Sequence, residues 1–199
     1  MISAIILAAG LSRRMKLGNK LLLKKNNVPI IKTTLERIQA SKVEDIIIVL
    51  GKDSKLILNS IKDKKIKISL NKNYQYGVST SIKKGIEKVD CSSDGVIICL
   101  GDMPLIKTST YNKIISAFYN NNKKKNIIPY YKNIKGNPVL FSRNYFKNLM
   151  KIKGDQGAKQ LIKNKEKDFM RVSTSDRGIL EDIDNEGQYL NFIENEKYN

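Results

Sequence analysis

Short apolar runs alternate with amphipathic segments along most of the chain. A continuous apolar run is typical of a strand buried on both faces of a parallel sheet, whereas apolar residues spaced three and four apart are typical of a helix. These patterns predict strands over Ile2–Leu7, Ile46–Leu50, Ile66–Leu70, Val96–Leu100 and Ile127–Tyr130, with shorter patterns at Pro138–Phe141 and Phe169–Val172. Helices are predicted over Pro29–Ala40, Ser54–Ile61, Ser79–Val89, Ser109–Tyr119, Arg143–Met150 and Gln156–Asn164.

The order of these elements predicts an α/β fold, a three-layer α/β/α sandwich in which βα units surround a mainly parallel, Rossmann-like sheet. We see no internal repeat and no linker rich in Gly, Pro or Ser, so we expect one domain over residues 1–199. In open sheets of this kind, ligands bind outside the carboxyl ends of the strands. We therefore expect the functional residues directly after the predicted strands.

The stretch Ile2–Lys20 has the features of a phosphate-binding turn. Ala8, Ala9 and Gly10 follow the first strand, and such small residues leave backbone N–H groups open to an anion. The segment that follows adds four cations, namely Arg13, Arg14, Lys16 and Lys20. The spacing fits neither GxGxxG nor GxxxxGK[ST], which excludes the dinucleotide and Walker-type loops. From the residues alone, a polyphosphate site and an ordinary turn remain equal alternatives.

Three acidic segments could hold a metal ion or contact a ligand. Asp102 follows the fourth strand within Gly-Asp-Met-Pro, where a carboxylate can bind Mg²⁺ that also touches a nucleotide, although the same residues often form a plain turn. The two carboxylates of Asp182-Ile183-Asp184 lie on the same side if this segment is extended. Asp155 precedes a predicted helix, so on its own it is expected to be the helix N-cap rather than a ligand contact.

Polar residues also follow the third strand. Asn71 comes first, then Tyr76-Gly77, then Ser79-Thr80-Ser81 at the start of a predicted helix. Hydroxyl and N–H groups at a helix start can hold an anion or the edge of a base. Ordinary capping by Ser79 explains the same residues equally well.

The chain is strongly basic, with a formal net charge of +18. Clustered Lys and Arg would indicate nucleic-acid binding, but here the lysines are spread along the chain, for example over 62–67, 123–125 and 147–167. Lys, Asn and Ile are all abundant, as an AT-rich genome would produce without selection for binding. We therefore expect solvated lysine faces and no nucleic-acid partner, and a positive field that speeds capture of an anionic small substrate.

The remaining composition limits the chemistry. No apolar run is long enough to span a membrane and the first lacks a basic leader and a cleavage site, so we expect a soluble cytoplasmic protein without a membrane partner. Cys91 and Cys99 are too few for a disulfide framework, and Cys99 fits a buried strand position. The chain has no histidine, which excludes Ser-His, Cys-His and His-metal mechanisms.

Several motifs together resemble one enzyme family. The string LAAGxSxRM at residues 7–15, followed by NKLL at 19–22, GDMP at 101–104, GNPVLF at 136–141 and GDQGA at 154–158, is similar to the MobA-like nucleotidyltransferases, especially the molybdenum cofactor cytidylyltransferase branch. Three positions depart from that pattern: Lys16 replaces a glycine, Asn137 stands where histidine is expected, and Asn185-Glu186-Gly187 replaces a threonine, a proline and acidic residues. The resemblance implies a sheet of the nucleotide-diphospho-sugar transferase type.

The resemblance also implies roles for individual residues. Nucleotide binding would involve Leu7, Ala8, Ala9, Gly10, Arg14, Lys20, Asn71, Gly77, Ser81 and Asp102. Arg14, Lys20 and Asp102 would be catalytic, and Asp102 with Asp184 would bind Mg²⁺. Asn137, Asp155 and Gln156 would contact the acceptor.

The implied reaction transfers CMP from CTP to the terminal phosphate of molybdopterin, with release of pyrophosphate. A phosphate monoester is largely ionised near neutral pH, so this reaction needs no histidine base. Ala9 favours the cytidylyl branch, because guanylyl-transferring relatives usually have glycine there. Two alternatives stay open: a non-catalytic or differently specific accessory protein that helps an apo molybdenum hydroxylase mature, and a nucleotidyltransferase acting on a sugar or alcohol phosphate.

Overall fold

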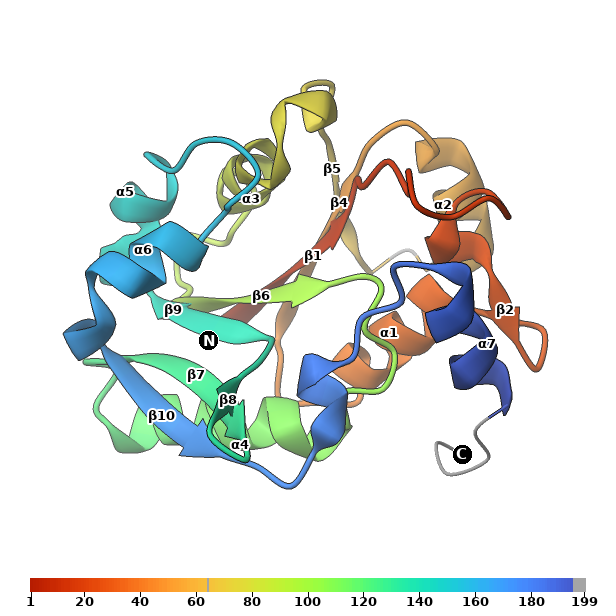
Figure 1. Ribbon diagram of the computed structural model, residues 1–199. Helices are drawn as coiled ribbons and strands as arrows, with labels where there is room; N and C mark the ends of the chain where they lie inside the picture. Colours follow the sequence, from red (N-terminus) through yellow and green to blue (C-terminus); the bar gives the residue numbers. More distant parts are fainter. Residues whose placement is uncertain (64, 195–199) are drawn as a thin grey trace.

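The computed structural model describes residues 1–63 and 65–194. Lys64, which belongs to the lysine run at 62–67, and the end of the predicted domain at 195–199 lie outside the described residues. The main sheet has the strand order β10-β7-β9-β6-β1-β4-β5 (Figure 1). Its strands are β1 (Ile2–Ala8), β4 (Asp45–Leu50), β5 (Lys67–Leu70), β6 (Gly95–Leu100), β7 (Asn126–Tyr131), β9 (Val139–Ser142) and β10 (Phe169–Ser173).

The centre of this sheet is parallel and its far side is mixed. Strand β1 pairs in parallel with β4 and β6, and β4 pairs in parallel with β5. Strand β9 runs antiparallel to β6 and β7, whereas β10 pairs in parallel with β7. The carboxyl ends of β1, β4, β5 and β6 therefore meet at one edge. The prediction of a mainly parallel sheet is confirmed, and all seven predicted strands are present with ends that shift by at most one residue.

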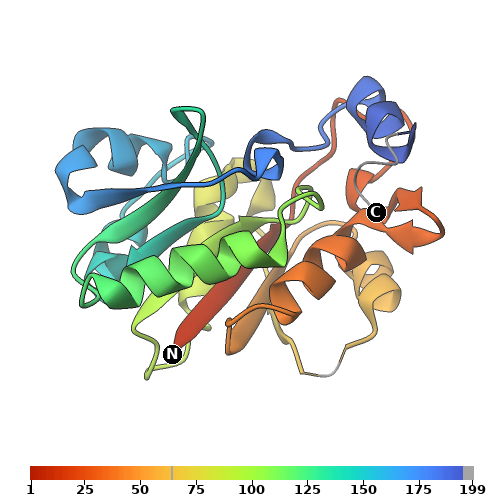
Figure 2. The ribbon, with the colours of Figure 1, turned by 90° about the horizontal axis from the view of Figure 1, so that it is seen from below.

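Helices cover both faces of the sheet, which confirms the three-layer arrangement (Figure 2). Helices α1 (Ile30–Gln39), α2 (Ser54–Ile61) and α4 (Thr108–Asn120) pack on one face. Helices α3 (Val78–Ile86), α5 (Phe146–Leu149) and α6 (Lys159–Asn164) pack on the other. No helix in the described part of the chain is long and apolar enough to span a membrane.

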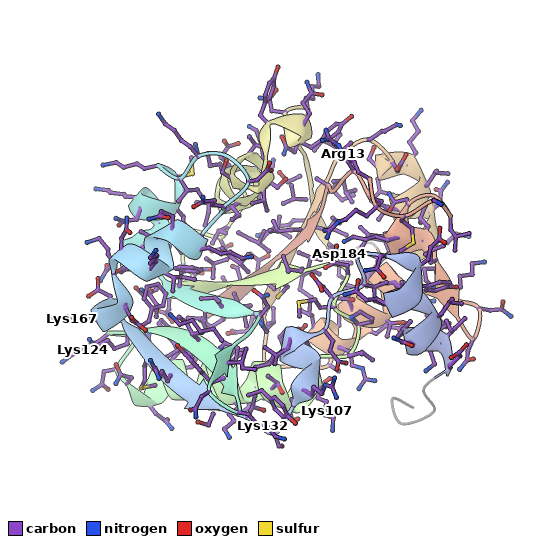
Figure 3. All side chains as sticks on the ribbon, in the orientation of Figure 1. Arg13, Lys107, Lys124, Lys132, Lys167 and Asp184 are labelled. Carbon is purple, nitrogen blue, oxygen red and sulfur yellow. The ribbon has the colours of Figure 1, made fainter. Side chains whose placement is uncertain are left out.

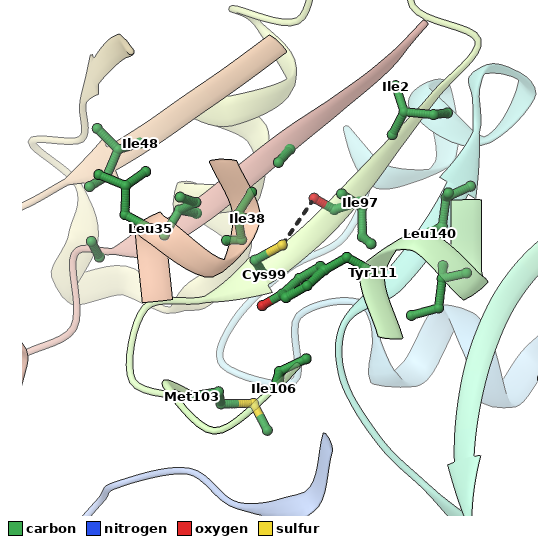
Figure 4. Close-up of a cluster of buried hydrophobic side chains, with 14 of the residues drawn as sticks. Ile2, Leu35, Ile38, Ile48, Ile97, Cys99, Met103, Ile106, Tyr111 and Leu140 are labelled. Atoms are coloured by element: carbon green, nitrogen blue, oxygen red, sulfur yellow. Dashed lines mark hydrogen bonds between the residues drawn. The ribbon is translucent and has the colours of Figure 1, made fainter. Parts of the chain in front are cut away.

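Strand β1 is buried on both faces because its side chains alternate between the two cores. Ala4, Ile6 and Ala8 belong to the core beneath α1 and α4, while Ile5 belongs to the core beneath α3. Each isoleucine removed from water contributes about 1.5 to 3 kcal/mol. Cys99 is fully buried in the first core, where its thiol points at the Ile97 carbonyl (Figure 4). It is the small buried residue that the strand pattern predicted.

Three predicted helices differ in the structure, and the first of them, α3, ends at Ile86 rather than at Val89. The segment predicted as one helix over 143–150 is a 3₁₀ turn, Arg143–Tyr145, followed by the short α5. Helix α6 begins at Lys159 rather than at Gln156. The reason lies in Gly154 and Gly157, whose φ angles of +68° and +53° are left-handed and prevent an earlier helix start.

Some elements were not predicted. They are the hairpin β2 (Lys24–Lys25) with β3 (Val28–Pro29), the short strand β8 (Ile134–Lys135) and the last helix, α7 (Glu186–Glu194). Residues 182–194 form a C-terminal strap that runs back across the loop that follows β1. A small separate core of Met15, Ile30, Ile183 and Phe192 joins the strap to that loop and to α1. The strap thus brings residues 182–194 to the carboxyl edge of the sheet (Figure 1).

Candidate active site

A pocket of about 410 Å³ opens at the carboxyl ends of β1 and β6. One wall is formed by the loop after β1 and by the C-terminal strap. The opposite wall is formed by the 3₁₀ turn η2 (Tyr74–Tyr76), the start of α3 and the loop before α6. The predicted site residues that line the pocket are Leu7, Ala9, Gly10, Arg14, Lys20, Ser81, Asp102, Asp155 and Asp184.

Lys20 lies at the centre of an ion-pair network in the first wall. Its ammonium contacts the carboxylate of Asp102 and lies 2.5 Å from Oδ1 of Asp184. Arg14 donates to Oδ2 of the same Asp184 at 2.6 Å. Asn19 positions the lysine, because its side chain accepts from the Leu21 N–H and begins the 3₁₀ turn η1 (Lys20–Leu22). Residues from the first and last parts of the chain therefore converge on one cation.

The network shifts the pKa values of its members. Burial alone would lower the pKa of Lys20, but the attraction of Asp102 and Asp184 outweighs burial and raises this pKa above its usual value. Burial would raise the pKa of Asp184, and the nearby Lys20 and Arg14 reverse the effect and lower it. Burial raises the pKa of Asp182, and repulsion by Asp184 and Asp102 adds to the effect. Asp184 is thus stabilised as a carboxylate while Asp182 is not.

One oxygen of Asp102 has no hydrogen-bond partner among the described residues, although it is buried. An unsatisfied buried acceptor costs about 1 to 3 kcal/mol, so this atom is suited to receive a ligand. Two hard carboxylate oxygens, from Asp102 and Asp184, fit a cation such as Mg²⁺ or Mn²⁺. No cluster of three His, Cys, Asp or Glu side chains that could hold a metal occurs in the described ranges. Phosphate oxygens and water would have to complete the shell, as is usual for Mg²⁺.

The turn after β1 leaves room for an anion. Ala9 and Gly10 line the pocket, whereas the Ala8 side chain is buried in the core at 2% exposure. A Cβ atom at Gly10 would meet nothing within 4 Å, so this glycine borders open space. The turn is held from below, since the Gly101 N–H donates to the Leu7 carbonyl at 3.0 Å. The ends of β1 and β6 are thereby tied together beside Asp102.

In the opposite wall, some residues line the pocket and others hold the lining residues in place. Ser81 lines the pocket, while Asn71 lies behind it, 3% exposed, and donates from Nδ2 to Ser81 Oγ at 3.0 Å. Ser79 is not the cap of α3, because the N-cap position is Gly77 and the buried Ser79 donates its N–H to the Gly154 carbonyl. Gly77, with φ +105°, lies against the backbone of Gly154, where a Cβ would approach to 2.5 Å.

The expectation that Asp155 caps the following helix is wrong. The N-cap of α6 is Ala158 and it makes no side-chain cap hydrogen bond, because the left-handed Gly157 delays the helix. Asp155 instead lines the pocket. The other two predicted acceptor residues, Asn137 and Gln156, are not among the described residues that line it. Asn137 donates its backbone N–H to the Ile179 carbonyl at 2.9 Å.

Tyr74 and Gln75 line the pocket and were not predicted. They lie on the short turn η2, just before the Tyr76-Gly77 pair that the sequence did indicate. A three-residue 3₁₀ turn has no periodic pattern, so only its position after β5 could have marked it. Glu186, which accepts from the Lys16 N–H at 3.2 Å, was also missed because its helix was not predicted.

The family comparison agrees with this geometry. Residues 4–169 match the model of the MobA-like NTP transferase domain, and the chain belongs to that family. The fold and the pocket therefore go together with membership of the MobA-like NTP transferase family.

Individual relatives differ in what they act on. The chain is 33% identical over 123 residues to 2-C-methyl-D-erythritol 4-phosphate cytidylyltransferase of Lachnoclostridium phytofermentans, a match covering 58% of this chain and 51% of the relative. It is 32% identical over 119 residues to a probable molybdenum cofactor guanylyltransferase of Thermococcus sibiricus, covering 59% and 56%. The chain therefore spans little more than half the length of these two relatives.

A solved structure shares the fold over nearly the whole chain. The manganese complex of Rv0371C from Mycobacterium tuberculosis H37Rv superimposes with a TM-score of 0.83, covering 97% of this chain and 98% of that one at 21% identity. The predicted nucleotide-diphospho-sugar transferase type of sheet is confirmed by such neighbours.

Proposed function

We propose that this protein transfers CMP from CTP to the terminal phosphate of molybdopterin, the organic part of the molybdenum cofactor, and releases pyrophosphate. The observation that carries the nucleotidyl-transfer part is the convergence of Lys20, Asp102 and Asp184 in the pocket that Ala9 and Gly10 also line. Cations and free N–H groups bind phosphates, and paired carboxylates bind the metal that accompanies a triphosphate.

In this proposal the protein contributes binding and positioning. The N–H groups of Ala9 and Gly10 and the cations of Arg14 and Lys20 hold the triphosphate and stabilise charge on the leaving pyrophosphate. Asp102 and Asp184 would hold Mg²⁺, which supplies Lewis-acid stabilisation at the phosphate oxygens. Manganese in a structural neighbour supports a divalent cation in this fold. The attacking phosphate is already ionised, in keeping with a chain that has no histidine.

The nucleotide and the acceptor depend on similarity. Ala9 and the motifs of the cytidylyltransferase branch support CTP, and the molybdenum cofactor guanylyltransferase from Thermococcus supports a molybdopterin acceptor. The erythritol-phosphate cytidylyltransferase supports the same nucleotide with an alcohol phosphate, which is the second candidate function. Asn137 stands in place of the expected histidine and carries no positive charge that would attract an anionic acceptor. The third candidate is therefore a non-catalytic accessory role.

A two-stage experiment tests this proposal. The first stage measures the melting temperature with Mg²⁺ and each of the four NTPs, since a ligand at about 100 times its Kd adds about 2.7 kcal/mol, or about 5 °C. The second stage measures pyrophosphate release with CTP and either molybdopterin, 2-C-methyl-D-erythritol 4-phosphate or a sugar 1-phosphate. Release only with molybdopterin supports the proposal. Pyrophosphate release only with another phosphate would mean that this compound, and not molybdopterin, is the acceptor. Nucleotide binding without pyrophosphate release with any of these acceptors would indicate the accessory role.

A further inference from the structure

The two walls of the pocket differ in charge. The wall formed by the β1 loop and the strap presents the cations Arg13, Arg14 and Lys20; Figure 3 labels Arg13 on the loop and Asp184 on the strap. The wall formed by η2, the start of α3 and the loop before α6 presents the aromatic Tyr74, polar groups and Asp155, and none of its described residues that line the pocket is a cation. If the pocket binds a nucleoside triphosphate, as proposed above, the phosphates face the first wall. The base then faces the second wall, because it is the uncharged end of the nucleotide.

Asp155 is an exposed residue at the edge of the pocket. The chain has 37 Lys and Arg against 19 Asp and Glu, yet the Asp155 carboxylate has neither an ion pair nor a hydrogen bond within the described residues. It caps no helix, and it lines the pocket in which a base would lie. Its carboxylate oxygens are therefore open to a ligand.

The loop that carries Asp155 is fixed against α3. The Ser79 N–H donates to the Gly154 carbonyl at 3.2 Å, and the backbones of Gly77 and Gly154 are in direct contact. On the other side of Asp155, a Cβ at Gly157 would lie 2.7 Å from the Val78 side chain. These close contacts on both sides hold Asp155 at the pocket without a contribution from its own side chain.

Ser81 supplies a donor in the same wall. Its Oγ accepts from Asn71 Nδ2 at 3.0 Å, so the hydroxyl proton points elsewhere, and no described residue accepts it. Asn71 is itself fixed, since its Oδ1 accepts from the Asn73 N–H at 2.9 Å. The second wall thus offers a hydroxyl donor from Ser81 and a carboxylate acceptor from Asp155.

We propose that Asp155 accepts a hydrogen bond from the exocyclic amino group of the base, and that the enzyme selects an amino-bearing base over uracil. Carboxylates accept from the cytosine amino group, and the Ser81 hydroxyl can donate to a ring nitrogen or carbonyl of the same base. Uracil has a carbonyl oxygen where cytosine has the amino group, so it would place an acceptor against an acceptor. This inference rests on the proposed nucleotide site, and it places Asp155 at the base rather than at the acceptor.

The test measures the dissociation constants of CTP, GTP and UTP with Mg²⁺ by calorimetry, for the unaltered protein, Asp155→Asn and Asp155→Ala. Using the ratio of UTP to CTP affinity removes the general effect of the lost charge on triphosphate binding. We expect the unaltered protein to prefer CTP or GTP over UTP by about tenfold or more, and both variants to lose most of this preference. Comparing CTP with GTP shows which amino-bearing base the pocket accepts.

Lys153→Ala is the control, because Lys153 is exposed on the same loop and does not line the pocket. It should keep the preference of the unaltered protein. Unchanged UTP to CTP ratios in both Asp155 variants would overturn the inference, as would a higher acceptor KM with an unchanged ratio. If no triphosphate binds the unaltered protein, the proposed function fails as well. If triphosphates bind with the expected preference but no CMP is transferred, only the proposed function fails.

Discussion

Two carboxylates contact the same lysine, but they are held by very different parts of the molecule. Asp102 follows β6 at the centre of the sheet, where Gly101 is hydrogen-bonded to both Leu7 and Thr34. Asp184 lies on the C-terminal strap, which rests on a small core and a few surface contacts, such as Tyr189 Oη with the Lys24 carbonyl at 2.8 Å. Local stability follows the amount of buried contact, so the strap can open while the sheet stays folded.

This comparison suggests that the two carboxylates contribute to the site in different ways. The Asp102 side belongs to the sheet, whereas we expect the Asp184 side to depend on the packing of the strap. Lys20 joins the two, since its ammonium contacts both carboxylates. Four substitutions separate these contributions, and we expect the largest effect at Asp102 and the smallest at Arg14.

Asp102→Asn should abolish most of the activity. The substitution removes the carboxylate charge from the rigid side of the site, and loss of a Lewis-acid site costs several kcal/mol, or about a thousandfold in kcat/KM. Pyrophosphate release with CTP, acceptor and Mg²⁺ measures it. Asp63→Asn, at a half-buried carboxylate outside the pocket, is the control and should keep full activity. Retention of most Mg²⁺-dependent turnover by Asp102→Asn would remove Asp102 from the reaction.

Lys20→Met should destabilise the protein by about 3 kcal/mol at neutral pH, because it leaves two nearly buried carboxylates without their shared cation. The effect should depend on pH. The pKa of Asp184 is lowered from 3.8, so its contribution is present above about pH 4 and is lost as the pH falls through the folded value. The pKa of Lys20 is raised from 10.5, so its contribution is present below that pH and is lost as the pH rises through the folded value.

Urea unfolding, followed by circular dichroism from acid to alkaline pH, measures this difference between Lys20→Met and the unaltered protein. The difference in unfolding free energy should be largest between about pH 4 and about pH 10.5, and smaller outside this range. Asp182 works in the opposite direction at low pH, because its pKa is raised and protonation relieves its repulsion from Asp184. A difference that stays constant over the whole range would show that the ion pairs do not hold the strap.

Phe192→Ala should open the strap and leave the sheet intact. The ring is 6% exposed in the small core and lies 5.2 Å from Lys25 Nζ, so its loss should lower the opening free energy by about 2 to 3 kcal/mol. Hydrogen exchange should speed up over 182–194 and over the β1 loop, and stay slow in β1 and β6. Leu190→Ala, at a 49% exposed position of the same helix, should change neither region. Faster exchange throughout the sheet would show that the strap is part of the global fold.

The same contrast explains what the sequence could predict. Strands β1 and β6 are continuous apolar runs buried on both faces, so both their existence and the placement of Asp102 could be predicted from pattern. Helix α7 buries Phe192 alone and is otherwise largely polar, so it lacks the apolar stripe that marks a helix. The Asp182-Ile183-Asp184 pattern indicated a second metal ligand, but only the fold shows that Asp184 contacts Lys20.

The prediction for the loop before α6 was wrong for a different reason. Asp155 has the residue type of an N-cap, and the following sequence has helical propensity, so a cap was the better local prediction. The left-handed glycines on either side of it pack against Gly77 and Val78, which lie far earlier in the chain. Contacts of this kind leave no local pattern, and they decide which wall of the pocket Asp155 joins.

Arg14→Ala should have the smallest effect on stability and a clear effect on substrate binding. Arg14 contacts Asp184 at 2.6 Å but its side chain is 71% exposed, and exposed ion pairs contribute about 0 to 1 kcal/mol. Because most of its guanidinium faces solvent at the pocket, it is available to a triphosphate. We expect a change in unfolding free energy below about 1 kcal/mol, together with a KM for CTP several-fold higher than that of the unaltered protein. This difference in KM should become smaller at high salt.

Arg14→Lys should restore part of the affinity for CTP by charge alone, without the bidentate geometry of the guanidinium. An unchanged KM in Arg14→Ala would mean that Arg14 serves only to hold the strap, and the variant should then resemble a mild form of Phe192→Ala in hydrogen exchange.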